Sequence, residues 1–526
     1  MLRHALWIAT LVGCVDATPA PDGSANRRPR SLSALDLPAP RTWRPIDNQP
    51  LMNTPAFAPA VGSLLTDGSV IFNDPTNTNW FKLIPDELGS YEHGTWKNLA
   101  DTPNNYAPLY FGSATLTDGR FIVEGGEYNA DVAVWTNKGA IYDPVNDKWT
   151  PVSPPSGWPT IGDASGIVFA DGTYTQSDCC TTVGLAALDP ASLTWTAPIG
   201  TGKADGHDEE SWAMMWDGRI VTVDANNVAN PDRSEIYDPT TQSWTGHGVV
   251  PVHIADHRPF PNAPTGSHEV GPEILRADGK VLAIGGTGHN ALYDPVADSW
   301  TAMPDLPGAN QSEDGPGVMM PNGDILLAIS PFPMSAPTPF NPPTTFYELH
   351  DTTFTPVAAS ANAANNNSYQ NFFLMLPSGE VMLSDSNGSI ELYTPAPGFV
   401  ENGIPAILAA PRLIGDGPEA STGSTITMYR GRSYTLPVYR MNGISQGAYY
   451  GDDAQMSTNF PIVRVTNNES GHVAFCRTYD HSNRSISPDS SGVTKLDVPT
   501  TADQGLSSLV VIANGIPSAP ITVNIK

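Results

Sequence analysis

The chain has 526 residues and a formal net charge of -28, from 26 basic and 54 acidic side chains. This length is enough for two or three domains, and the negative charge argues against nucleic acid as a partner, because its phosphates would be repelled. Glycine (47) and proline (51) are abundant, whereas charged residues make up only 15%. Many turns and few charged helix faces favour an all-β protein.

The N-terminus has the pattern of an export signal. A basic start precedes a short apolar run at 5–12, which is too short to span a bilayer as a helix. Residues 11–14 match a bacterial lipobox in which Cys14 would be lipidated, and the alternative is cleavage near residues 17–20. We therefore predict a signal peptide with lipobox at 1–14 and a flexible tether at 15–38. The protein would be secreted or held at a bacterial cell envelope, touching the membrane only through this lipid anchor.

One sequence motif recurs through residues 63–382. It consists of an apolar stretch, a two-residue turn that ends in glycine, and an apolar strand. Such turns join the strands of a β-hairpin, because glycine accepts a positive φ. The turn glycines are Gly68, Gly119, Gly172, Gly218, Gly279, Gly323 and Gly379. A second phrase follows most copies, a Tyr-Asp-Pro sequence and then a tryptophan, as in Tyr142 and Trp149. The tryptophans recur at about 50-residue intervals, the period of a four-stranded kelch blade.

The seventh unit lacks its tryptophan strand, and a matching segment stands near the N-terminus. Residues 42–46 (TWRPI) resemble residues 148–152 (KWTPV), so the N-terminal strand is expected to complete the last blade and close the ring. Residues 39–404 are thus predicted to form a seven-bladed kelch-type β-propeller, with an open array of β-sandwiches as the alternative. After residue 405 the repeated turn glycines and tryptophans are absent. Short strands with Asn-Gly and Pro turns there predict an immunoglobulin-like β-sandwich at 405–526.

This organisation over residues 40–526 resembles galactose oxidase and glyoxal oxidase. The resemblance implies one copper held by two tyrosines and two histidines, with one tyrosine cross-linked to a cysteine. Tyr110 opens a segment matching the cross-linked tyrosine, but Ala58 stands where the cysteine is needed. Tyr369 matches the second tyrosine, and the histidine that follows it is replaced by Gln370.

The second histidine aligns loosely with Asn459, in Thr458-Asn459. Copper(II) favours imidazole ligands, so copper and copper-radical oxidase activity are not expected. The resemblance also implies that residues 447–453 form a loop reaching toward the propeller.

Counting back nine or ten residues from each turn glycine reaches the positions that should line one mouth of the central channel. The candidate ligand-binding residues there are Asp163, Glu209, Glu269 and Asp314, flanked by Tyr110, Tyr369 and Gln370. His207 and His268 lie just before two of the carboxylates, so His207, His268, Asp163 and Glu209 are candidate metal ligands.

Converging carboxylates repel one another, and three arrangements relieve this repulsion. They can bind a divalent cation such as calcium, hold protons for acid–base chemistry, or point into water. Adjacent Cys179 and Cys180 can form a disulfide or remain a reduced pair, and the sequence leaves both open.

Three functions follow from these features. The first is a surface lipoprotein that binds a carbohydrate or another small polar ligand, directly or through a cation. The second is an extracellular enzyme with a repurposed pocket, either a metal-dependent oxidase or a carboxylate-based lyase or hydrolase acting on carbohydrate. The third is a structural protein whose channel is filled by side chains. Fold alone does not decide among them.

Overall fold

The computed structural model describes residues 41–259, 268–332, 340–415, 426–451 and 454–526, which belong to one compact unit. The predicted signal peptide, Cys14 and the tether lie outside the described residues. Strands dominate the described chain, and the few helices are single 3-10 turns, η1 (Pro50–Met52), η2 (Ser368–Gln370) and η3 (Glu401–Gly403). The all-β class is confirmed.

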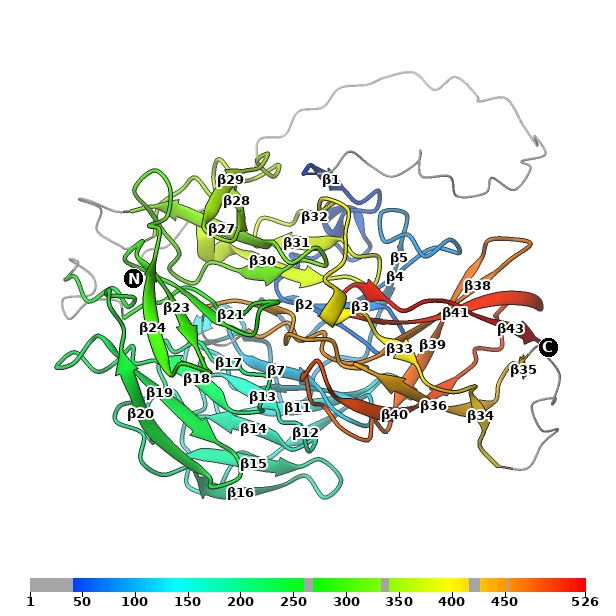
Figure 1. Cartoon of the computed structure of the whole chain (residues 1–526), viewed down its shortest axis with the longest axis horizontal. Helices are drawn as coiled ribbons and strands as arrows, with labels where there is room; N and C mark the ends of the chain where they lie inside the picture. The colour runs from blue at the N-terminus through cyan, green and yellow to red at the C-terminus, as the bar shows by residue number, and fades with distance from the viewer. Residues whose placement is uncertain (1–40, 260–267, 333–339, 416–425, 452–453) are drawn as a thin grey trace. The chain divides into compact units, whose positions relative to one another are not determined.

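Seven sheets built on four antiparallel strands follow one another through the described residues (Figure 1), and we number them blades 1 to 7. Blades 1 to 3 consist of β2 (Gly62–Leu64), β3 (Val70–Asn73), β4 (Trp80–Ile84) and β5 (Thr95–Asn98); β7 (Gly112–Thr115), β8 (Phe121–Glu124), β11 (Gly139–Asp143) and β12 (Lys148–Val152); and β13 (Gly166–Val168), β14 (Tyr174–Ser177), β15 (Leu185–Asp189) and β16 (Thr194–Ile199). A small additional sheet joins β6 (Pro108–Leu109), β9 (Tyr128–Asn129) and β10 (Val132–Ala133).

The other four blades repeat this order from the inner to the outer strand. They consist of β17 (Ala213–Met214), β18 (Ile220–Val223), β19 (Arg233–Asp238) and β20 (Ser243–Val249); β21 (Glu273–Leu275), β22 (Val281–Ile284), β23 (Asn290–Asp294) and β24 (Ser299–Met303); β26 (Gly317–Met319), β27 (Ile325–Pro331), β28 (Thr345–His350) and β29 (Thr353–Pro356); and β30 (Asn371–Met375), β31 (Val381–Asp385), β32 (Ile390–Tyr393) and β1 (Trp43–Pro45). In blade 6, β25 (Asn310–Gln311) also pairs with β27.

The inner strands of the blades meet in a closed ring. Contacts join β2 to β30, β30 to β26, β26 to β21, β21 to β17, and β13 to β7. The hydroxyl of Thr115 in β7 donates to the carbonyl of Leu64 in β2 (3.2 Å), and the hydroxyl of Ser165 donates to the carbonyl of Glu210 (3.4 Å), which joins blades 3 and 4. The first and last parts of the chain share blade 7, because β1 pairs antiparallel with β32, with Trp43 opposite Tyr393.

The recurring tryptophans attach each outer strand to the preceding blade. The indole of Trp149 donates to the carbonyl of Ala100 (3.0 Å), that of Trp195 to the carbonyl of Ser153 (2.8 Å), and that of Trp300 to the hydroxyl of Ser234 (2.8 Å). Trp43 donates in the same way to the carbonyl of Ala358, between blades 7 and 6. These four tryptophans therefore pack between blades and also donate a hydrogen bond to an acceptor of the preceding blade.

The residues after 405 form a β-sandwich. Its strands run in the order β33 (Ala406–Ile407), β36 (Ser433–Tyr439), β40 (Ser491–Asp497), β39 (Val473–Tyr479), β38 (Ile462–Asn467), β41 (Gly505–Ala513), β43 (Ile521–Ile525) and β35 (Ile426–Met428), with β34 (Arg412–Leu413) on β36 and β42 (Ile516–Pro517) on β41. β39 pairs with β38 through its first half and with β40 through its second, so the strand passes from one layer to the other. The alternating residues Tyr434, Leu436 and Val438 of β36 point into the core between the layers. The immunoglobulin-like topology and the domain boundaries stay predictions.

Candidate functional site

A segment of the C-terminal sandwich enters the propeller ring. β37 (Ala448–Tyr449) pairs with β26, the inner strand of blade 6. Beside it, the side chain of Gln446 accepts from the amide of Met214 in blade 4 (2.7 Å), and that of Gln455 donates to the hydroxyl of Ser165 in blade 3 (3.2 Å). The predicted loop that reaches the propeller is therefore present, and part of the channel is filled by protein.

Tyrosines gather where this segment ends. The ring of Tyr110 stacks on that of Tyr450 (centroids 5.5 Å apart, 18° between planes) and meets Tyr369 edge to face (6.4 Å). The hydroxyl of Tyr450 donates to the carbonyl of Tyr369 (2.6 Å). Burial raises the pKa of the Tyr110 phenol well above its usual value, so this group stays protonated. The cluster unites blades 2 and 7 with the C-terminal domain.

The donors around Tyr110 do not fit the copper site that the resemblance implies. The side-chain oxygen of Gln370 accepts from the backbone amide of Asn367 (3.1 Å), so it caps η2. Asn459 accepts from the buried guanidinium of Arg484 (3.1 Å). Tyr450, the residue after β37, stacks on Tyr110. The loose alignment of Asn459 with the second histidine stays a prediction. The rings that contact Tyr110 among the described residues are those of Tyr128, Tyr369, Phe372 and Tyr450, and none is an imidazole.

Three of the four predicted carboxylates meet at the mouth. Glu209, Glu269 and Asp314 come from the loops before blades 4, 5 and 6, and one oxygen of each lies within 4.8 Å of the others. Burial, then the charge of Asp314, raises the pKa of Glu269 well above its usual value. Such a cluster either holds a shared proton or binds a cation.

The backbone at this mouth is held in an unusual conformation. Tyr110 (φ 52°), Glu209 (φ 58°), His268 (φ 67°) and Asp314 (φ 48°) occupy the left-handed region at related positions of the repeat. Gly162 (φ 71°) takes this position in blade 3. Non-glycine residues adopt such angles at a cost of about 1–3 kcal/mol each, and strain of this kind concentrates at functional sites.

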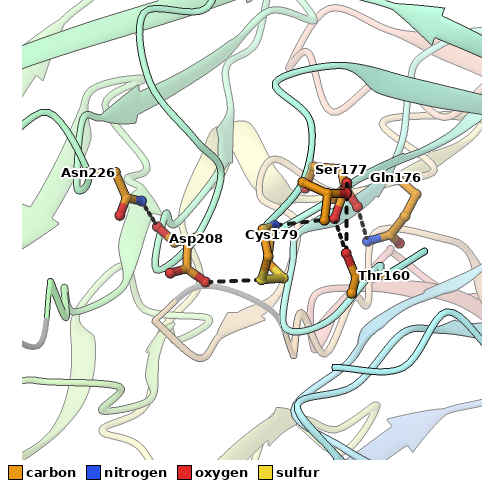
Figure 2. Close-up of a disulfide and its surroundings, with 9 residues drawn as sticks. Thr160, Gln176, Ser177, Cys179, Asp208 and Asn226 are labelled. Carbon is orange, nitrogen blue, oxygen red and sulfur yellow. Dashed lines mark hydrogen bonds between the residues drawn. A yellow bond between two sulfur atoms is a disulfide. The ribbon is translucent and has the colours of Figure 1, made fainter. Parts of the chain in front are cut away.

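Asp163 does not join the other carboxylates. Its carboxylate lies instead beside Cys179, Cys180 and Asp208, with one ligand atom of each of the four within 4.8 Å of the others. Cys179 and Cys180 are joined by a disulfide, which settles the alternative that the sequence left open. Figure 2 shows this bond beside Asp208.

The two predicted histidine ligands also lie apart from the carboxylate cluster. The Nε2 atom of His207 is 3.3 Å from the carbonyl of Val183, and burial lowers the pKa of this imidazole to about 3. The ring of His268 contacts that of His257 (5.2 Å), and its Nδ1 atom lies 3.1 Å from the side-chain oxygen of Asn226. The structure therefore does not assemble His207, His268, Asp163 and Glu209 into one set of ligands.

A buried ion cluster supports the loop that carries Asp208 and Glu209. The ammonium of Lys203 is fully buried and pairs with Asp205, with Glu210 (2.9 Å) and with Glu235 (2.7 Å). Burial lowers the pKa of Lys203, but these carboxylates outweigh it and leave the pKa raised. Sequence reasoning missed this cluster, because Lys203 and Glu235 lie in different segments of the chain. The amino-acid sequence does not show that these charged side chains are buried.

Comparisons with known proteins agree with the repeat. No family model matches the chain. Kelch-like protein terF of Aspergillus terreus is 37% identical over 84 residues, covering 15% of this chain and 17% of that protein, so the chain spans about a sixth of the length of the curated relative it matches. Over this segment the chain resembles a kelch-like protein. In this kelch-like chain the four-stranded sheets and their tryptophans account for the repeated sequence.

Solved structures align with this kelch-like chain at low identity. A fungal alcohol oxidase of the AA5 family, in complex with copper, aligns with a TM-score of 0.47 and 13% identity, covering 92% of this chain and 99% of that one. The extracellular domain of a proposed hybrid two component system from B. thetaiotaomicron aligns with a TM-score of 0.44 and 11% identity, covering 93% of this chain and 59% of that one. Among the described residues, no helix has the length and apolar character to cross a membrane.

Proposed function

We propose that this protein is an exported binding protein whose acidic mouth holds a divalent cation, calcium, and through it a polyhydroxylated carbohydrate. The observation that carries the proposal is the convergence of Glu209, Glu269 and Asp314 from three successive blades. Carboxylate oxygens are the ligands that calcium prefers, and the ion leaves coordination positions for sugar hydroxyls.

The electrostatics of the cluster support a cation. Without one, three carboxylates within 4.8 Å repel one another. Burial, and then the charge of Asp314, raises the pKa of Glu269. The chain as a whole is strongly acidic, which attracts cations toward this mouth. The adjoining rings of Tyr369 and Phe340 (4.7 Å) provide an apolar surface of the kind that packs against a sugar ring.

The same proposal excludes copper-radical oxidation. The Tyr110 cluster offers phenols where the resemblance implies imidazoles, and Ala58 has no sulfur for a thioether. Export and anchoring through Cys14 rest on the N-terminal sequence pattern.

Calorimetric titration of the purified protein with calcium tests the site. We expect one equivalent to bind, and Glu269→Gln and Asp314→Asn to weaken binding at least tenfold, because each removes an anionic ligand. The matched control is Asp278→Asn. Asp278 is an exposed residue that pairs with Arg276 near Glu269 in the sequence, and the variant should bind calcium as the unchanged protein does. Glycan binding that is lost when a chelator removes calcium would support binding of the carbohydrate through the cation.

Two outcomes would change the assignment. One equivalent of copper together with production of hydrogen peroxide would overturn it in favour of an oxidase. Turnover of an oligosaccharide that Glu209→Gln abolishes would favour the carboxylate-based enzyme instead.

A further inference from the structure

The disulfide turn of blade 3 is held in place by bonds that do not involve sulfur. The amide of Cys179 donates to the carbonyl of Ile161 (3.0 Å), and the amide of Cys180 donates to the carboxylate of Asp178 (3.2 Å). Asp178 is fully buried and also accepts from the hydroxyls of Thr160 (2.9 Å) and Thr181. The turn should therefore keep its place whether the sulfur–sulfur bond is closed or open.

Two carboxylates face the sulfurs from separate loops. Asp163 is 5% exposed and comes from the loop before β13, and Asp208 comes from the loop before β17. The Sγ atom of Cys180 lies 3.8 Å from Oδ1 of Asp208. The backbone carbonyl of Asp208 accepts from the side chain of Asn226 (Figure 2), and the buried Lys203 cluster holds Glu210 two residues further on. The backbone of Asp208 is thus held by contacts that do not involve sulfur.

The chemistry of these four side chains changes with the state of the sulfurs. In the disulfide the sulfurs carry no charge and are poor ligands. As thiolates they are soft ligands, and together with two carboxylates they make a four-donor set suited to a tetrahedral divalent ion. Without a metal, the nearby carboxylates oppose ionisation of the thiols, and a bound cation reverses this effect.

We propose that reduction of Cys179–Cys180 opens a site for zinc, or for another divalent cation that accepts thiolates, formed with Asp163 and Asp208. An external dithiol supplies two electrons and two protons to the sulfur–sulfur bond, yielding two cysteine thiols while the dithiol becomes its own disulfide. Binding of the cation then releases the two thiol protons. Cys180 is exposed, so the reductant and the cation can both reach it.

This site is distinct from the proposed calcium site, since Glu209, Glu269 and Asp314 supply none of its ligands. It prefers a different ion because half of its donors are sulfur. Calcium binding and thiol-dependent metal binding can therefore fail independently.

The test uses the full chain in its oxidised form and after reduction with a phosphine, which becomes its oxide with an oxygen from water. Cadmium is the spectroscopic probe, because thiolate coordination produces charge-transfer absorption, and zinc is counted by elemental analysis. We expect the reduced protein to bind one more equivalent than the oxidised protein and to show the absorption. Equal metal content in the two forms would overturn the proposal.

Variants separate this site from the buried Cys476 thiol, which is present in both forms. Asp208→Asn keeps both cysteines and should weaken zinc binding to the reduced protein at least tenfold, whereas Cys180→Ser should abolish the extra equivalent. Alkylation of Cys180 in the reduced wild-type chain gives the same loss without any substitution. Retention of the extra equivalent after alkylation would contradict the assignment.

Discussion

At the scale of single residues, a buried cluster of charges around Lys203 supports the loop that carries Asp208 and Glu209. Lys203 is the cation at the centre of three carboxylates, and burial raises the pKa of the nearby Asp224 to about 7. Replacing the cation leaves buried anions without compensation, which is costly in a site that excludes water.

Lys203→Met should therefore lower the free energy of unfolding by about 3–5 kcal/mol. Lys97→Met is the control, because Lys97 is half exposed and its pair with Asp147 should contribute less than about 1 kcal/mol. Denaturant unfolding of both variants measures the difference. Similar losses in the two variants would show that the buried cluster does not stabilise the fold.

Glu269 provides a second prediction at this scale. Because its pKa is raised, the carboxyl holds a proton over a range where an ordinary glutamate is ionised, and calcium must displace that proton. Calcium affinity should thus increase as pH rises, by up to tenfold per unit while Glu269 is protonated. Calorimetry at several pH values checks this, and an affinity independent of pH would argue that Glu269 is not a ligand.

At the scale of elements, the turn glycines share one backbone conformation but not one environment. Gly218 (φ +87°) and Gly279 (φ +81°) both adopt angles that favour glycine. An added Cβ at Gly218 meets nothing within 4 Å, whereas at Gly279 it would lie 2.6 Å from the ring of Trp216 in the neighbouring blade. The second glycine therefore also permits contact between blades.

Gly218→Ala should cost about 1–2 kcal/mol through backbone strain alone. Gly279→Ala should cost at least about 1 kcal/mol more, because the methyl group displaces Trp216. Unfolding midpoints of the two variants test the pair. The expectation fails if both substitutions have the same effect.

At the scale of the whole molecule, the ring closes where the two ends of the propeller sequence meet. The ring of Trp43 packs on Phe346 (5.1 Å) and Tyr393 (4.9 Å), and Arg44 bridges Glu92 and Glu380 (both 2.6 Å). These contacts tie β1 to blades 1, 6 and 7, so the closing strand is held from three directions.

Trp43→Ala should lower the free energy of unfolding by about 3 kcal/mol and expose the amides of β32 to hydrogen exchange. Trp135→Ala is the matched control, because Trp135 is 52% exposed and should change stability by less than about 0.5 kcal/mol. Unchanged protection of β32 in Trp43→Ala would show that the ring does not rely on this strand.

Local sequence determines the parts of this protein that repeat. The turn glycines adopt a positive φ in each of the seven hairpins. Tryptophans recur because several outer strands contact the preceding blade through an indole, as Trp149 and Trp195 do. Glu209, Glu269 and Asp314 lie nine or ten residues before the turn glycines of their blades, a spacing that the amino-acid sequence alone contains. Their role as ligands stays a prediction.

Tertiary structure alone decided the contacts between segments that the repeat does not relate. Pairing of β37 with β26 brought Tyr450 to Tyr110, where the alignment had suggested Asn459. The amide of Cys179 donates a hydrogen bond to the carbonyl of Ile161, and the carboxylate of Asp163 lies with the disulfide and Asp208 rather than with the other three carboxylates. The repeat shows which residues occupy equivalent positions in successive blades. The direction of each side chain depends on the loop that packs against it, and only the folded chain determines that packing.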